Sequence, residues 1–230
     1  MGSPALSLTI DQEPIQSGRV ILCEGSGDKN VFQSLITTRN LPDFYVTHPR
    51  EGTDPGGRAG FTSRLRGLRL QPGFDDVTGI IVVSDSDNDA NASFRQVRTL
   101  IHNAGYRAPN QPSVYVAGPP AMCVRLIPNT NEVGQLETLC LRAIQGAWPN
   151  QYQCAEDYAQ CTGVETWPRN KKERAKLRAL IAHVCMTDPN TSLSHLWHGG
   201  REEVVPLGDA AFDDIAAFLS GFDAAVANAV

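Results

Sequence analysis

The chain has 230 residues, of which 41% are hydrophobic and 20% are charged, and its net charge is −5. Such a chain is long enough to bury one full core with an appended lobe. The acidic balance excludes a protein that coats nucleic acid by bulk attraction, but not a nuclease, whose metal site needs carboxylates. The sequence has no apolar run near the roughly 18 residues of a membrane span and no secretory leader, so we expect a cytoplasmic protein without membrane contact.

Short apolar runs predict strands in the first part of the chain. These runs are residues 19–23, 44–48, 79–84, 114–116 and 123–127. Between them, apolar residues at helical spacing predict helices that begin at Asp28, near Phe61, near Asn91 and at Gly134. Strands that alternate with helices indicate an α/β fold, with a Rossmann-like, mostly parallel sheet and helices on both faces.

We expect this α/β core to span residues 1–148, and residues 149–230 to form a helical C-terminal region packed on it. That region contains a basic amphipathic stretch at 169–186 and an apolar stripe from Asp209 to Val226. The six cysteines include no CxxC pair, and several lie in apolar patterns. Their spacing predicts reduced, buried thiols rather than a disulfide framework or a zinc site.

Acidic residues follow two of the predicted strands directly. Glu24 follows the first strand, and Asp85 and Asp87 follow the strand at 79–84. If these strands are neighbours in a parallel sheet, the carboxylates converge at its carboxyl edge, where ligands bind in open α/β folds. Bare carboxylates would repel one another, and one would have to take a proton. A hard divalent cation removes the conflict, so the pattern predicts a magnesium or manganese site.

The aspartates have two other interpretations. The run from Asp85 to Asp89 resembles the start of a calcium loop, but Ala90 and Gln96 stand where that motif needs Gly and Glu, which rejects it. The acids could instead decorate a helix N-terminus, where Asp is favoured. Asp89 in particular is either a metal ligand or the N-cap of the helix that begins near Asn91.

The segment Val20-Ile-Leu-Cys-Glu-Gly25 with Asp28, followed by Ile81-Val-Val-Ser-Asp-Ser-Asp87, resembles the Toprim domain of topoisomerases, bacterial primases and overcoming-lysogenization-defect nucleases. The nearest likeness is to the small, stand-alone DUF3226 type, because a segment like Ile127-Pro-Asn-Thr-Asn-Glu-Val-Gly-Gln-Leu-Glu137 follows. The resemblance implies a Toprim fold and Mg²⁺-dependent phosphodiester chemistry. The sequence has no tyrosine in the setting of a topoisomerase nucleophile and no zinc ribbon of the primase kind. Cleavage by hydrolysis is therefore favoured over cleavage with religation.

Carried over by this resemblance, Glu24, Asp85 and Asp87 are the expected catalytic and metal-binding residues. Asp28 and Glu137 are expected as further metal ligands, although each could equally be a first-turn helix carboxylate. The function that follows is a Mg²⁺- or Mn²⁺-dependent nuclease acting on DNA or RNA. A role in phage defence beside a separate ATPase also follows from the resemblance, since this chain has no GxxxxGK[ST] loop.

The alternatives are a non-catalytic binding or regulatory subunit whose metal only orders the fold, and a DxD glycosyl- or nucleotidyltransferase. A nucleic-acid partner also needs cations near the metal. Two basic stretches supply candidates, which are Arg58, Arg64 and Arg66 in one and Lys171, Lys172 and Arg174 in the other. The competing interpretation of both stretches is a solvated helix face. The oligomeric state is left open, and a homo-oligomer is compatible with the sequence.

Overall fold

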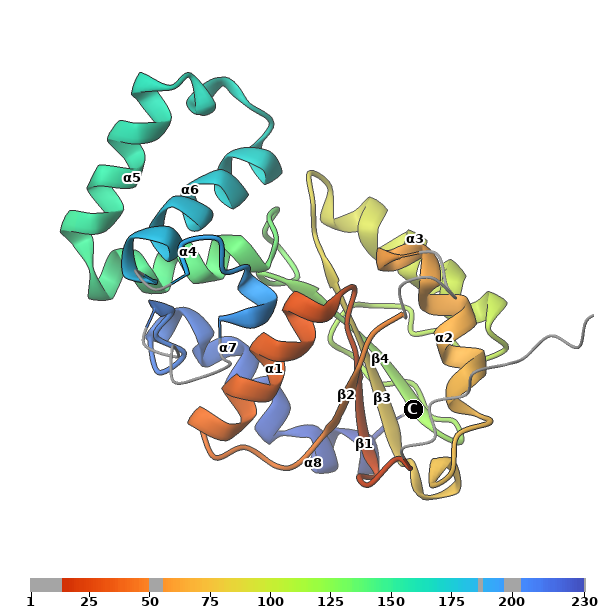
Figure 1. Ribbon diagram of the computed structural model, residues 1–230. Helices are drawn as coiled ribbons and strands as arrows, with labels where there is room; N and C mark the ends of the chain where they lie inside the picture. The colour runs from red at the N-terminus through yellow and green to blue at the C-terminus, as the bar shows by residue number, and fades with distance from the viewer. Residues whose placement is uncertain (1–13, 50–55, 186–187, 197–203, 230) are drawn as a thin grey trace, which may run out of the picture.

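A four-stranded parallel sheet forms the centre of the computed structural model, which describes residues 14–49, 56–185, 188–196 and 204–229 (Figure 1). The strand order within these residues is β2-β1-β3-β4. The strands are β1 (Arg19–Leu22), β2 (Tyr45–Thr47), β3 (Gly79–Asp85) and β4 (Ala121–Ile127). The prediction of a Rossmann-like α/β fold with a parallel sheet is confirmed.

The central strands are continuous apolar runs because both faces of the sheet are covered. In β3, Ile81 and Val83 face one hydrophobic cluster, whereas Ile80 and Val82 face the other. Their neighbours in β1 alternate in step, with Ile21 opposite Ile81. Burial of each such side chain contributes roughly 1.5–3 kcal/mol, so the register of β1 against β3 is fixed on both faces.

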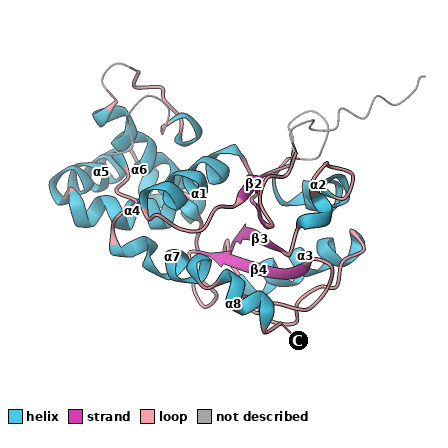
Figure 2. Cartoon of the chain, turned by 90° about the horizontal axis from the view of Figure 1, so that it is seen from below, coloured by secondary structure: helices cyan, strands magenta, loops and turns pink. Residues whose placement is uncertain are grey.

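Helices cover the two faces of the sheet as separate groups (Figures 1 and 2). One face packs against α1 (Ser26–Thr38), α4 (Leu136–Ala147), α7 (Asp213–Ser220) and α8 (Phe222–Ala227). The other face packs against α2 (Phe61–Leu68) and α3 (Ala90–Asn103). The helix that follows β1 and the helix that follows β3 therefore lie on opposite faces.

The C-terminal region is helical, as predicted. It contains α5 (Pro149–Cys161) and α6 (Arg169–Val184) before α7 and α8. Leu177 and Ile181 of α6 belong to the same buried cluster as Ile21 of the sheet, so the apolar core continues past residue 148. Short 3₁₀ turns occur at η1 (Gly57–Gly60), η2 (Phe74–Asp76), η3 (Val164–Thr166), η4 (Leu193–His195) and η6 (Ala210–Phe212).

Two expected elements differ in the structure. Residues 114–116 form no strand and contribute only an isolated antiparallel bridge from Val116 to Met122. The apolar stripe after Asp209 is split into η6, α7 and α8, with Gly221 between α7 and α8. The predicted helix at 169–186 ends at Val184, and residue 186 lies outside the described residues.

All six cysteines are free, as predicted, and Cys23, Cys123, Cys140 and Cys185 are buried. The prediction of burial is wrong for Cys154 and Cys161, which are exposed on α5. Burial raises the pKa of the Cys23 and Cys140 thiols well above the ordinary value. None of the described helices combines the length and the apolar character needed to cross a membrane.

Candidate functional site

The candidate site lies where the strand order reverses, because β2 is added on one side of β1 and β4 on the far side of β3. β1 and β3 are parallel neighbours, and the helices after them leave toward opposite faces. A crevice therefore opens beyond the carboxyl ends of these two strands, which is where ligands bind in folds of this kind. Glu24 follows β1, and Asp85 is the last residue of β3. The expected convergence of the two acids is confirmed, since Asp85 N donates to Glu24 Oε1 at 3.1 Å.

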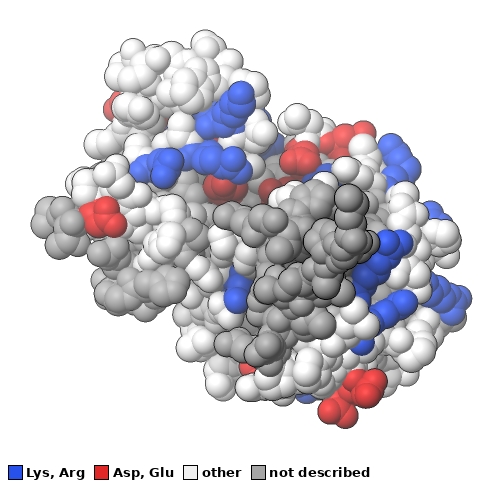
Figure 3. Space-filling view, turned by 45° about the vertical axis from the view of Figure 1, so that its right-hand side comes forward, with Lys and Arg blue, Asp and Glu red and all other residues white. Residues whose placement is uncertain are grey.

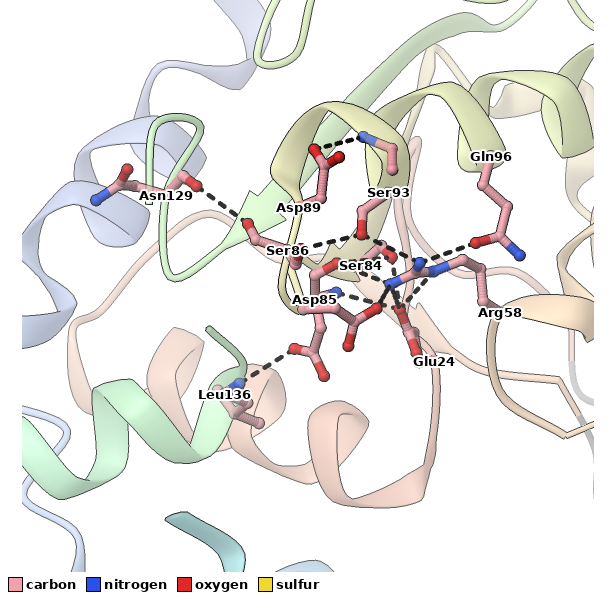
Figure 4. Close-up of polar contacts among 12 residues, drawn as sticks. Glu24, Arg58, Ser84, Asp85, Ser86, Asp89, Ser93, Gln96, Asn129 and Leu136 are labelled. Atoms are coloured by element: carbon pink, nitrogen blue, oxygen red, sulfur yellow. Dashed lines mark hydrogen bonds and ion pairs between the residues drawn. The ribbon is translucent and has the colours of Figure 1, made fainter. Parts of the chain in front are cut away.

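Glu24 is held by its Oε1 atom. Besides the amide of Asp85, this oxygen accepts a hydrogen bond from the hydroxyl of Ser84 at 2.5 Å. Both donors belong to β3, so the neighbouring strand sets the position of the carboxylate (Figure 4). The Glu24 side chain stays 23% exposed, so the crevice gives solvent and ligands access to it.

Asp85 lies on the α1 and α4 side of the sheet. Its residue follows the alternation of Ile81 and Val83, which face that side. The amide of Leu136, at the start of α4, donates to Asp85 Oδ1 at 3.1 Å. Burial raises the pKa of Asp85 well above its ordinary value, and repulsion from Asp28 and Glu24 adds to the shift. The expected repulsion among the carboxylates is therefore present.

The loop after β3 holds Asp87 at the rim of the crevice. The backbone amides and carbonyls of Asp87 and Gly134 exchange two hydrogen bonds of 2.9 Å. Asp87 has φ 51° and Gly134 has φ 146°, so both lie in the region that favours glycine. This bridge ties the β3–α3 loop to the segment before α4, and it leaves the Asp87 side chain 47% exposed.

Asp28 and Glu137 complete an acidic cluster with Glu24, Asp85 and Asp87. Asp28 Oδ2 accepts a hydrogen bond from Gly25 N at 2.9 Å, which is the contact of a first-turn helix acid. Burial, followed by repulsion from Glu24, raises the pKa of Asp28 to about 7. Glu137 is buried in the first turn of α4, where Arg174 Nε donates to its Oε1 at 2.9 Å.

Asp89 stands apart from this cluster. Its Oδ1 atom accepts a hydrogen bond from Ala92 N at 3.0 Å, and Asp89 is the N-cap of α3. This is the second of the two roles expected for Asp89, and it accounts for an Asp at this position without a metal.

Arg58 lies inside the acidic cluster rather than at its edge. Its Nη2 atom is 3.0 Å from Glu24 Oε1 and 2.9 Å from Asp87 Oδ2, and it donates to the carbonyl of Asp85 at 2.7 Å. Its Nη1 atom donates to Gln96 Oε1 at 3.0 Å. The guanidinium thus neutralises part of the charge that a bound cation would otherwise balance (Figure 4).

The other predicted nucleic-acid contacts are distributed unevenly. Arg64 is buried and donates to Thr47 Oγ1 at 2.6 Å, so that prediction is corrected: the side chain fills the space between α2 and β2. Arg66 is exposed and donates to the carbonyl of Asn103. In α6, Lys171 is exposed, whereas Lys172 is paired with Glu165 at 2.7 Å. Only Arg174 of this stretch is paired to an acid of the candidate site.

In the space-filling view, acidic side chains lie in a hollow of the surface with Lys and Arg side chains along its margin (Figure 3).

A family model described as DUF3226, a protein of unknown function, matches residues 18–218. The chain belongs to the DUF3226 family. The match covers the sheet, the acidic cluster and most of the C-terminal helices. Neither the curated proteins nor the solved structures include a match.

The oxygen atoms of this DUF3226 protein fit a hard cation in their chemistry. Five carboxylates each accept hydrogen bonds through one oxygen, and the other oxygen accepts none from a described residue. They are Glu24, Asp28, Asp85, Asp87 and Glu137. Within the described part of the chain, however, no three Asp, Glu, His or Cys side chains are placed to hold one metal together. Mg²⁺ needs only one or two carboxylates and keeps several waters, so the set fits hydrated Mg²⁺.

Several site residues were missed in the sequence. Ser84, Ser93 and Gln96 contact Glu24 or Arg58 through their side chains, and Leu136 contributes only its backbone amide. Ser84 carried a usable signal, because it interrupts a buried apolar strand immediately before Asp85. Backbone donors such as Leu136 N carry none, since every residue except proline has one.

Proposed function

We propose that this protein is a Mg²⁺-dependent nuclease of the Toprim type, which hydrolyses phosphodiester bonds of DNA or RNA. The observation that carries the proposal is the meeting of Glu24, Asp85 and Asp87 beyond the carboxyl ends of two adjacent parallel strands. The Glu and DxD pattern that resembles Toprim domains comes from these same residues. Burial and mutual repulsion both disfavour the charged carboxylates of Asp28 and Asp85, and a bound cation would relieve this penalty.

Mg²⁺ or Mn²⁺ bound at this edge would polarise a phosphoryl oxygen and make a bound water more acidic. Glu24 and Asp85 would hold the cation with the oxygens that make no protein contact. Asp87, on the rim, would reach it from the side on which nucleic acid enters. The Oδ1 atom of Asp28 accepts no hydrogen bond from a described residue, so Asp28 is placed to accept a proton from the attacking water.

The chain also places cations where a phosphate backbone would pass. Arg58 lies among the acids and pairs with Glu24 and Asp87, and Arg174 pairs with Glu137. Once a divalent cation neutralises the acids, both guanidinium groups become available for phosphate oxygens. With a net charge of −5, binding depends on such local contacts and should weaken steeply with salt.

A cleavage assay tests the proposal. Supercoiled plasmid, linear duplex, single-stranded DNA and structured RNA would each be incubated with Mg²⁺ and with Mn²⁺. Asp85→Asn and Glu24→Gln should abolish cutting, while Asp89→Asn, which preserves an N-cap, should cut like the wild type. Cutting that survives both Asp85→Asn and Glu24→Gln would place the activity elsewhere or in a contaminant.

One observation favours a second candidate, a non-catalytic subunit that binds metal only to order its fold. Arg58 already occupies the centre of the acids, and the described residues show no ready three-ligand metal site. Such a subunit would gain thermal stability from Mg²⁺ but cut none of the four substrates. The proposed role in phage defence with a separate ATPase rests on the Toprim resemblance alone, and adding such a partner is the natural next assay if the isolated chain is inert.

A further inference from the structure

We propose that the cavity between α1, α4 and α6 binds one nucleotide unit of the substrate, with its phosphate beside Arg178 and its sugar and base against an aliphatic wall. The inference rests on the proposed function and deepens it, because it assigns a place to the nucleotide next to the cleaved bond. The cavity has a volume of about 340 Å³. Small-molecule sites in proteins measure roughly 300–1,000 Å³, so one nucleotide matches it in scale.

The cavity is continuous with the acidic cluster. Asp28 and Glu137 line it, and both act electrostatically on Asp85. A ligand in the cavity therefore lies directly beside the acids that would hold the metal. This position fits a group attached to the phosphate under attack.

One wall of the cavity is cationic, and one of its two arginines is not paired with an acid among the described residues. Arg174 and Arg178 stand one helical turn apart on α6, on the same face of the helix. Arg174 is paired with Glu137, but exposed Arg178 has no hydrogen bond or ion pair with any residue that the structure describes. Its guanidinium presents several donors in a planar fork, the geometry that binds phosphate oxygens in pairs.

The first turn of α1 faces the same cavity. Ser26 and Gly27 line it, the N-cap residue Gly25 has no side chain to accept from their amides, and Asp28 accepts from Gly25 N instead. Their amides are among those that a helix leaves without internal partners. They supplement Arg178 as donors to an anion, although the cavity and the unpaired guanidinium carry the inference.

The remaining wall is aliphatic. Leu177, Ile181 and Leu193 line it, and no aromatic side chain is among the residues described around the cavity. Aliphatic side chains contact the sugar and base without reading hydrogen bonds on the base edge. We therefore expect binding that depends on phosphate and on a nucleoside of any base, with little preference among the four bases.

The acids at the back of the cavity make this binding depend on metal. Asp28 and Glu137 would repel a phosphate group in the absence of a cation. Bound Mg²⁺ reverses the sign of that interaction. Nucleotide binding should consequently be weak in EDTA and appear when Mg²⁺ is added, which separates this site from a simple basic patch.

Isothermal titration calorimetry on the full chain tests the inference, with the four deoxynucleoside monophosphates, thymidine and inorganic phosphate as probes, each with Mg²⁺ and with EDTA. The monophosphates should bind in Mg²⁺ with affinities within a few-fold of each other, and more tightly than thymidine or phosphate. Arg178→Gln should weaken this binding about tenfold, because the charged hydrogen bonds from the guanidinium to the phosphate are lost. Arg178→Lys should recover part of the loss. Arg98→Gln, on α3 at the other face of the sheet, should change nothing.

Three results would overturn the inference: Mg²⁺ binding without nucleotide binding, equal affinity for phosphate and nucleotide, or unchanged affinity in Arg178→Gln. In those cases the metal site and the nuclease proposal would stand. If the wild type bound no divalent cation, the nuclease proposal and the nucleotide site would fall together. Cleavage is not needed for any of these readings, so an absent activating partner does not confuse them.

Discussion

Arg58 Nη2 lies 3.0 Å from Glu24 Oε1, so an internal cation already pairs with the acid that should ligate metal. The same nitrogen pairs with Asp87, and only 11% of the Arg58 side chain is exposed. The arginine and a divalent cation therefore compete for the same charge. Metal affinity, fold stability and phosphate binding become linked through this one guanidinium.

Replacement of Arg58 by Gln should raise the affinity for Mg²⁺, roughly tenfold for about 1.4 kcal/mol of competition removed. The same change should lower the affinity for single-stranded DNA in Mg²⁺, since a phosphate contact is lost. Calorimetry with Mg²⁺ and fluorescence anisotropy with labelled DNA measure the two effects. Exposed Arg107→Gln is the matched control and should change neither. Weaker Mg²⁺ binding in Arg58→Gln would mean that Arg58 organises the ligands instead of competing.

Asp85→Asn should stabilise the metal-free protein and abolish its response to Mg²⁺. The variant removes a buried charge that burial and neighbouring acids disfavour, and its amide oxygen can still accept from Leu136 N. We expect a gain of about 1–2 kcal/mol, or a few degrees in Tm for a chain of this size. Thermal unfolding in EDTA and in Mg²⁺ checks both parts. A loss of stability in EDTA would contradict the inference that burial and neighbouring acids make Asp85 destabilising in the metal-free protein.

The stability of the metal-free protein should fall as pH rises from about 4 to about 7. Asp28 holds its proton up to a pKa of about 7 in the folded chain, whereas its ordinary pKa is 3.8. Between these values the folded state binds more protons than the unfolded state, so the free energy of unfolding decreases with pH. Asp85 acts in the same direction, because its pKa is also raised.

Urea unfolding in EDTA across this pH range measures the effect, and Asp28→Asn should make the decline shallower. Saturating Mg²⁺ should also flatten it, since a cation favours the ionised carboxylates. An identical decline in wild type and Asp28→Asn would assign the proton uptake to other groups.

The acidic cluster could be predicted because its cause is local and periodic. A buried parallel strand must be apolar, so the point where Val83 gives way to Ser84 and Asp85 marks the carboxyl edge of the sheet. Glu24 marks the carboxyl end of β1 in the same way, because it follows an apolar strand. Two such strand ends need only be neighbours to bring their acids together, and the order β2-β1-β3-β4 makes them so.

The positions of the cations could not be predicted in the same way. A charge run shows that a helix is polar but not which charges meet an acid from another element. Arg64 is buried against Thr47, and Lys176 is buried against Glu156, although both read as surface charges. These pairs depend on how α2 packs on the sheet and how α5 packs on α6, which local sequence does not encode.

Gly134 should tolerate no side chain, because its backbone positions Asp87. A Cβ at Gly134 would lie 2.6 Å from Thr138 Oγ1 and 3.1 Å from Pro128 Cδ, in a backbone conformation with φ 146°. We expect Gly134→Ala to lower the free energy of unfolding by about 2–3 kcal/mol and to weaken Mg²⁺ binding by displacing Asp87 from the rim.

Gly67→Ala is the matched control, since nothing lies within 4 Å of its Cβ position inside α2. It should stabilise the chain by up to about 1 kcal/mol and leave Mg²⁺ affinity unchanged. If Gly134→Ala lost stability but kept full Mg²⁺ affinity, Asp87 would not be a ligand, and the cation would depend on Glu24 and Asp85.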